Sequence, residues 1–244
     1  ERDYRRNDLH IIESCLAQSQ SSNVFEYIKQ IAGLSNLKNE ETGEKLLSKK
    51  FDKISFVGSD VALAKYLNPS SLQGKRTERE YIPIFPFGCN NSQYKAVKNA
   101  MENQISVIQG PPGTGKTQTI LNIIANILMQ GKTVQIVSNN NSATENVYEK
   151  LSLPKYNLGF VAATLGSSKN KKLFVEHQDA AYPDFSSWKT QEDPSVLQKG
   201  IADQSSQLKS VFDKQEKLAC LRQELSQLVT EQEYFNQYVK ESDV

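Results

Sequence analysis

The chain has 244 residues, and its 29 basic residues nearly balance 28 acidic ones, giving a net charge of +1. This balance excludes recognition of nucleic acid by the charge of the whole chain, so any such contact must be local. No apolar run approaches the roughly 18 residues that cross a bilayer, so the sequence predicts no membrane-spanning helix and no membrane partner.

The cysteines and histidines are isolated from one another. Cys15, Cys89 and Cys220 lie far apart without a partner at metal-ligand spacing, and neither His10 nor His177 has one. We therefore expect reduced, structural cysteines and ordinary histidines rather than a zinc site. This cysteine usage favours a cytoplasmic or nuclear compartment, and we expect a cytoplasmic protein. The chain starts without methionine or a signal-peptide core, as expected of a cut inside a longer chain.

Residues 1–80 are predicted to form a mainly helical accessory region. Apolar residues recur at helical spacing around residues 9–16 and 24–32. A turn at 68–71 and a charged connector at 74–80 indicate a boundary near residue 80. We expect this region to pack on the domain that follows it.

Residues 81–97 lead into the next domain. The prolines of 81–88 hold this stretch extended, and its aromatic residues Phe85 and Phe87 are predicted to fill the edge of a core. A helix is predicted to open at 91–97, with Asn91 or Ser92 as its cap.

Residues 110–117 read Gly-Pro-Pro-Gly-Thr-Gly-Lys-Thr and fit the pattern G-x-x-x-x-G-K-[ST] without a mismatch. A triphosphate demands many N–H donors around clustered negative charges, and the three glycines allow successive backbone N–H groups to turn inward. Lys116 would reach the β and γ phosphates. Thr117 would offer its hydroxyl to Mg²⁺ where a helix points its positive end at the phosphates. The motif predicts a bound nucleoside triphosphate.

The surroundings of this phosphate-binding loop (P-loop) agree with that prediction. The expected elements are a buried strand at 104–109, a helix at 119–129, a strand at 133–137, a helix at 142–151 and a strand at 160–164. Strand, loop, helix and strand form a right-handed βαβ unit with the ligand at the carboxyl end of the first strand. The predicted fold class is α/β, with a parallel sheet in a P-loop core.

Residues 190–244 are predicted to form one long helix, a coiled-coil arm. Proline and glycine nearly vanish after Gly200. Apolar residues with a/d spacing form a seam, which consists of Val211, Leu218, Leu221, Leu225, Leu228, Phe235 and Val239. One helix cannot bury such a seam, so we expect a partner for the arm.

Three blocks of this sequence resemble one family. Residues 91–97, 106–117 and 134–143 are similar to the Q motif, motif I and motif Ia of superfamily-1 helicases, closest to the RNA-surveillance and immunoglobulin-switch branch. The resemblance covers roughly residues 88–166. It implies a RecA-like fold for residues 81–180, ATP and Mg²⁺ as cofactors, and single-stranded DNA or RNA and a second RecA-like domain as partners.

The resemblance also implies roles for particular residues. Lys116 and Thr117 are the expected catalytic residues, and Thr117 is the expected Mg²⁺ ligand. The residues expected to bind the nucleotide are Gln93, Gly110, Pro111, Pro112, Gly113, Thr114, Gly115, Lys116, Thr117 and Gln118. Gln93 would donate to and accept from the adenine edge, which an amide side chain can do at once. The extended aromatic segment 81–88, called the lead-in below, would also allow a ring to lie against the adenine.

Asn141 and Ser142 lie where the family's loop grips the backbone of single-stranded nucleic acid. Family members usually carry a small residue, a proline and a serine before that asparagine, whereas this chain has Ser138, Asn139 and Asn140. A nucleic-acid loop and a plain turn both remain open.

The hydrolytic carboxylates of motif II have no counterpart in this sequence. After residue 166 no apolar strand ends in Asp-Glu, and the pair Glu192-Asp193 lies in a polar segment. The chain thus resembles an amino-terminal fragment of a motor that stops inside an inserted helical stalk, expected to bind ATP without turning it over.

The leading interpretation is the nucleotide-binding part of an ATP-dependent DNA or RNA helicase or translocase. The alternative is a P-loop nucleotide switch whose coiled-coil arm binds a protein or clamps nucleic acid without unwinding. A purely structural coiled coil would leave the P-loop without a purpose.

Overall fold

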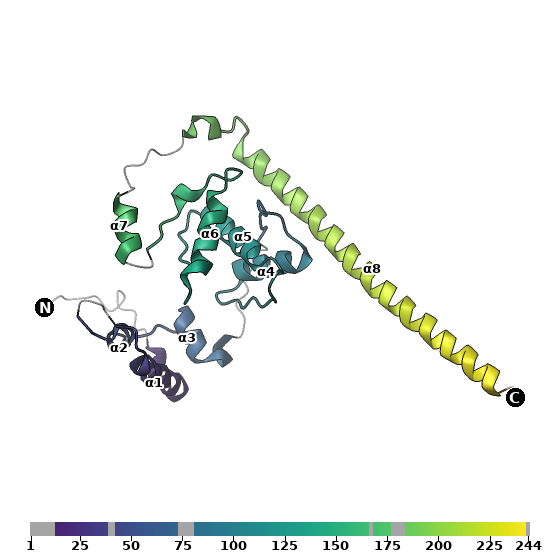
Figure 1. Ribbon diagram of the computed structural model, residues 1–244, viewed down its shortest axis with the longest axis horizontal. Helices are drawn as coiled ribbons and strands as arrows, with labels where there is room; N and C mark the ends of the chain where they lie inside the picture. Colours follow the sequence, from purple (N-terminus) through teal and green to yellow (C-terminus); the bar gives the residue numbers. More distant parts are fainter. Residues whose placement is uncertain (1–12, 39–41, 73–80, 166–167, 177–183, 243–244) are drawn as a thin grey trace, which may run out of the picture. The chain divides into compact units, whose positions relative to one another are not determined.

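The computed structural model describes residues 13–38, 42–72, 81–165, 168–176 and 184–242. These residues belong to two compact units, Glu1–Glu78 and Arg79–Val244 (Figure 1).

The first unit is built from short helices around one small core. Its elements are η2 (Cys15–Ala17), α1 (Ser19–Leu34), α2 (Leu46–Asp52), α3 (Ala62–Leu67) and η3 (Pro69–Leu72), where η denotes a 3-10 helix. The core consists of the buried residues Cys15, Phe25, Val57, Ala64 and Leu67. In α1, Ser21, Phe25 and Ala32 are buried, since residues four and seven apart share one face of a helix.

The second unit carries the P-loop. Its elements are α4 (Asn91–Glu102), α5 (Lys116–Met129), α6 (Asn141–Ser152), η4 (Gly159–Val161), α7 (Ser168–Glu176), η5 (Phe185–Trp188) and α8 (Pro194–Ser242). Helix α5 packs on α6, and the core between them consists of Leu121, Ile124, Val147 and Leu151. Phe87, Leu158 and Ala162 lie against this core. The predicted helix after the P-loop is therefore present, and it starts three residues earlier than the periodicity indicated.

The predicted strands do not form a sheet in the described part of the chain. Residues 104–109 and 133–137 contain no strand, and Val107 and Val137 are 80% and 79% exposed. A strand exists only through its ladder with a neighbouring strand, so apolar patterning alone does not produce one. In place of the start of the third predicted strand, Phe160 and Val161 belong to η4. The parallel sheet stays a prediction.

Helix α8 runs without a break from Pro194 to Ser242, and much of it has no described helix beside it (Figure 1). The described side chains from residue 213 onward are exposed, including the apolar seam residues in that stretch. None of the helices in the described ranges is long and apolar enough to cross a membrane.

Candidate functional site

The P-loop turns sharply into helix α5. Gly113 and Gly115 have φ angles of 85° and 79°, in the left-handed region that favours glycine. Gly115 is the N-cap residue of α5, and Lys116 is the first residue of the helix. A Cβ atom on Gly115 would overlap the Nε2 atom of Gln93, so glycine is required there for space as well as for conformation.

Lys116 folds back over its own loop. Its Nζ atom donates to the carbonyl oxygens of Gly110 at 2.6 Å and Pro111 at 3.0 Å. The hydroxyl of Thr114 also donates to the Pro111 carbonyl, at 2.8 Å. These contacts keep the ammonium group beside the turn, within reach of any anion that the turn holds.

Gln93 joins helix α4 to the P-loop. Asn90 is the N-cap of α4: its side chain accepts from the N–H of Gln93 at 2.9 Å, and the Gln93 side-chain oxygen accepts from the N–H of Asn90 at 3.0 Å. The Nε2 atom of Gln93 lies 3.2 Å from the Thr114 carbonyl and 3.3 Å from the Gly115 carbonyl. The predicted cap, Asn91 or Ser92, was one or two residues late. The predicted nucleotide ligand is thus also a structural link, with 7% of its surface exposed.

Gln118 closes this group of contacts. Its Oε1 atom accepts from Nε2 of Gln93 at 3.3 Å, and its Nε2 atom donates to the carbonyl oxygen of Phe87. The extended lead-in, helix α4 and helix α5 therefore meet beside the P-loop.

Two buried asparagines of α5, Asn122 and Asn126, hold the extended lead-in, and sequence reasoning missed them. Asn126 accepts from the N–H of Ile84 at 2.9 Å and donates to its carbonyl at 2.8 Å. Asn122 accepts from the N–H of Phe87 at 3.2 Å and donates to the Gly88 carbonyl at 2.8 Å. The available signal was two asparagines four residues apart in an otherwise apolar helix, since buried amides must find partners.

The aromatic residues of the lead-in pack inside the unit. Phe87 lies 4.7 Å, centroid to centroid, from Tyr156 and contacts the α5–α6 core. Phe85 lies 5.2 Å from Tyr94 of α4. Both rings therefore fill the edge of the packing, as the sequence predicted, rather than standing free for contact with an adenine.

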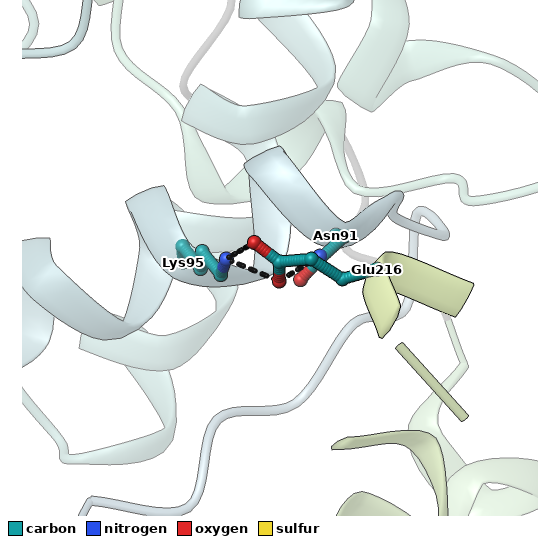
Figure 2. A network of polar contacts seen from close by, with 3 residues as sticks. All are labelled: Asn91, Lys95 and Glu216. Carbon is teal, nitrogen blue, oxygen red and sulfur yellow. Dashed lines mark hydrogen bonds and ion pairs between the residues drawn. The ribbon is translucent and has the colours of Figure 1, made fainter. Parts of the chain in front are cut away.

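Helix α8 contacts helix α4 at Asn91 and Lys95, two residues to either side of Gln93. Figure 2 shows Glu216 of α8 between Lys95 and Asn91 of α4, with Lys95 Nζ at 2.8 and 3.1 Å and Asn91 Nδ2 at 3.2 Å. Hydrogen bonds from Lys95 and Asn91, with the charge of Lys95, lower the pKa of the Glu216 carboxyl. No pattern in the sequence indicates this pairing, which joins residues more than a hundred positions apart.

The predicted nucleic-acid loop forms the start of α6. Asn140 caps the helix, and its side chain accepts from the N–H of Ser142 at 3.0 Å and from the Ser142 hydroxyl at 2.9 Å. Asn141, the first residue of the helix, is exposed. The hydroxyl of Ser142 is thus engaged in the cap, whereas Asn141 faces solvent.

The acidic pair Glu192-Asp193 lies just before the start of helix α8, where Asp193 makes a structural hydrogen bond. Asp193 accepts from the N–H of Ser195 at 2.7 Å at the start of α8, and its hydrogen bonds with Ser195 lower the pKa of its carboxyl. The described residues contain no group of three or more histidine, cysteine or acidic side chains that could hold a metal ion. Cys15 is buried, Cys89 half-buried and Cys220 exposed, all as free thiols, and burial raises the pKa of Cys89.

The donor groups at this site fit a phosphate chain. The first N–H groups of a helix have no partner within the helix, and at α5 these belong to Lys116, Thr117 and Gln118. The positive end of α5, the lysine ammonium group and the glycine-rich turn meet at one place. An anion with several oxygens is the ligand that such a donor set accepts.

The comparison with known sequences decides the family. Residues 88–243 match the AAA domain family. The chain belongs to the AAA domain family.

The chain is similar to proteins named as a DNA helicase, a DNA-binding protein and a regulator of nonsense transcripts. Over 98 residues the chain is 38% identical to the DNA polymerase alpha-associated DNA helicase A of Schizosaccharomyces pombe, covering 38% of this chain and 15% of the relative. It is 36% identical over 99 residues to the DNA-binding protein SMUBP-2 of Mesocricetus auratus, covering 38% of this chain and 10% of the relative. It is 43% identical over 63 residues to the Regulator of nonsense transcripts 1 homolog of Drosophila melanogaster, covering 25% and 5%. No solved structure matches.

The family match and these relatives confirm the predicted resemblance to superfamily-1 helicases. They imply the P-loop type of nucleotide-binding domain. The matched segments are 5–15% of the length of these three relatives, so they compare only the region around this AAA domain.

Proposed function

We propose that this chain is the nucleotide-binding part of an ATP-dependent DNA or RNA helicase or translocase. The whole protein would couple ATP hydrolysis to movement along single-stranded nucleic acid. The observation that supports this most directly is the turn at Gly113 and Gly115, which delivers Lys116 and the N-terminus of α5 to one place. That turn lies inside the segment that matches the AAA domain family.

Each residue of the turn has a proposed task. The N–H groups from Gly113 to Gln118 bind phosphate oxygens. Lys116 leaves the carbonyls of Gly110 and Pro111 for the β and γ phosphates, since a charged acceptor binds an ammonium group more strongly than a carbonyl does. Thr117 offers its hydroxyl to Mg²⁺, which neutralises charge on the phosphates when bound.

The proposal is tested by calorimetry with Mg·ATP on the 244-residue chain. Lys116→Ala should weaken binding by at least about tenfold, because it removes the charge-assisted contacts. Lys132→Ala is the matched control, since Lys132 is exposed and its side chain contacts Gln130. Absence of heat with a folded parent protein would refute nucleotide binding.

Adenine recognition by Gln93 is a second part of the proposal. The side-chain oxygen of Gln93 accepts one hydrogen bond, from Asn90, and so keeps a lone pair for the 6-amino group of adenine. Its N–H groups serve the P-loop carbonyls, so donation to the adenine ring would require an exchange of partners. Gln93→Ala should weaken both ATP and GTP through the P-loop, and ATP further through the base. Equal losses for the two nucleotides would contradict base recognition.

The alternative function, a nucleotide switch, has one observation in its favour. The seam residues of α8 are all exposed, with Leu225 at 62% and Phe235 at 63%. A switch would use this surface to bind a protein or to clamp nucleic acid. The full-length protein distinguishes the two functions: strand-stimulated ATPase that is lost in Lys116→Ala supports the motor, and nucleotide-dependent partner binding without stimulated turnover supports the switch.

A further inference from the structure

Helix α4 presents two different faces to its neighbours. Gln93 points toward the P-loop and donates to the carbonyls of Thr114 and Gly115. Tyr94, the next residue, lies against Phe212 of α8, and Lys95 reaches Glu216. A displacement of α4 toward or away from α8 would therefore move the group that supports the P-loop.

The apolar half of this contact is a buried ring pair. Phe212 and Tyr94 meet edge to face with centroids 5.8 Å apart, and each ring is 7% exposed. Phe212 is the one residue of α8 that is buried, among those whose side chains the structure describes. Tyr94 also contacts Phe85, with ring centroids 5.2 Å apart. The ring pair fixes where α8 crosses α4.

The polar half lies one helical turn further along α8. Glu216 follows Phe212 by four residues, so both lie on one face of the helix. Its carboxylate accepts from Lys95 and Asn91, which are themselves four residues apart on α4 (Figure 2). The side chains of Lys95 and Glu216 are 55% and 52% exposed, so the ion pair contributes little energy and mainly sets the register of the two helices.

We propose that Phe212 and Glu216 are positioning residues for the nucleotide site, acting through α4 and Gln93. They hold α4 where the Gln93 amide reaches the carbonyls of Thr114 and Gly115. This inference rests on the proposed function, because it assumes that the P-loop binds a nucleotide. By linkage, a bound nucleotide stabilises the seating of α8 on α4 to the same extent that this seating strengthens nucleotide binding.

A double-mutant cycle on the 244-residue chain tests the route through Gln93. With Mg·ATP in a calorimeter, Phe212→Ala should weaken binding by about three- to tenfold, the range expected for loss of an aromatic pair. In a Gln93→Ala background the same change should alter the affinity by less than about twofold, because the link to the P-loop is already absent. A merely structural role for Phe212 would cost the same in both backgrounds.

Matched variants separate this route from general damage to α8. Phe235→Ala removes an exposed ring of the same helix, and Glu224→Gln removes an exposed carboxylate, so both should leave the affinity unchanged. Glu216→Gln should weaken binding by about twofold, and the charge exchange of Lys95→Glu with Glu216→Lys should restore part of it. Circular dichroism establishes that each variant is folded.

Each outcome of the double-mutant cycle supports or overturns the positioning role of Phe212 and Glu216. Loss in Phe212→Ala that disappears in the Gln93→Ala background supports the proposal. Equal loss in both backgrounds, or no loss in Phe212→Ala and Glu216→Gln while the parent binds nucleotide, overturns it. A folded parent that binds no nucleotide removes the proposed function as well, and the parent titration alone distinguishes that case.

Discussion

The side chain of Asn126 holds both backbone polar groups of Ile84, accepting from its N–H at 2.9 Å and donating to its carbonyl at 2.8 Å. The same side chain accepts from the hydroxyl of Tyr81 at 3.0 Å and donates to the carbonyl of Asn122 at 2.7 Å. A single buried amide thereby pairs with an extended segment much as a neighbouring strand would.

Replacing Asn126 should therefore destabilise the second unit. Asn126→Ala leaves the N–H and carbonyl of Ile84 without these partners, and the cost should be about 2–4 kcal/mol in the free energy of unfolding. Urea denaturation followed by circular dichroism measures it. Asn99→Ala, at an exposed site on α4, is the control and should change stability by less than about 0.5 kcal/mol. Equal effects at the two sites would contradict the role given to Asn126.

Gly115→Ala should strongly weaken nucleotide binding in a chain that still folds. The substitution meets a positive φ of 79° and a Cβ position already occupied by the Gln93 amide. The P-loop must then move away from α4, and the affinity for Mg·ATP should fall by at least about tenfold in calorimetry. Gly200→Ala on α8, where a Cβ has open space, should keep the affinity and favour the helix by roughly 0.5–1 kcal/mol. Retained binding in Gly115→Ala would argue against this conformation of the loop.

Asn141→Ala should weaken the binding of single-stranded nucleic acid by a protein that contains both motor domains. A lost hydrogen bond to a backbone phosphate predicts about a two- to tenfold loss of affinity. The slope of affinity against salt concentration should not change, because asparagine carries no charge. Fluorescence anisotropy over a salt series measures both, with Asn146→Ala on the same helix as the control. An unaltered affinity would remove Asn141 from the proposed nucleic-acid site.

The Glu216 carboxyl should titrate below an ordinary glutamate. Its pKa is lowered in the folded chain by Lys95 and Asn91, so the ionised, paired form is present at neutral pH and above the ordinary pKa. The stabilisation is lost as the pH falls through the lowered pKa. A carbon-13 NMR titration should give a midpoint for Glu216 below that of an ordinary glutamate side chain, and Lys95→Met should raise it. A midpoint that Lys95→Met leaves unchanged would show that the pair does not persist in solution.

Local motifs allowed the P-loop and its helix to be predicted, because a glycine-rich turn before a helix needs residues that are adjacent in the chain. Gly115 therefore ends the turn as the N-cap of α5, and Lys116 is the first residue of the helix. Contacts between segments that are far apart in the sequence leave no local motif of this kind. The pairing of Glu216 with Lys95 depends on where α8 crosses α4. Nothing in the sequence around either residue distinguishes it from a charged residue that faces solvent.

The seam of α8 illustrates the same limit. The a/d pattern drew attention to Val211, yet Val211 is 48% exposed, and its neighbour Phe212 is the residue that packs on Tyr94. Periodicity along a helix shows which residues share a face but not which face meets a neighbour. The predicted strands meet a related limit: Val107 and Val137 have residue types typical of strands, but the described residues form no ladder with them, and the parallel sheet stays a prediction.

The crossing of α8 over α4 also has a mechanical consequence. About 26 residues separate Glu216 from Ser242 in an unbroken helix, a span of roughly 39 Å at 1.5 Å per residue. A tilt of about 5° at the crossing would displace the far end by roughly 3 Å, the width of a hydrogen bond, from a change of well under 1 Å at the pivot itself. A small adjustment at the α8–α4 crossing would thus become a larger displacement at the far end, so α8 has the geometry of a lever arm.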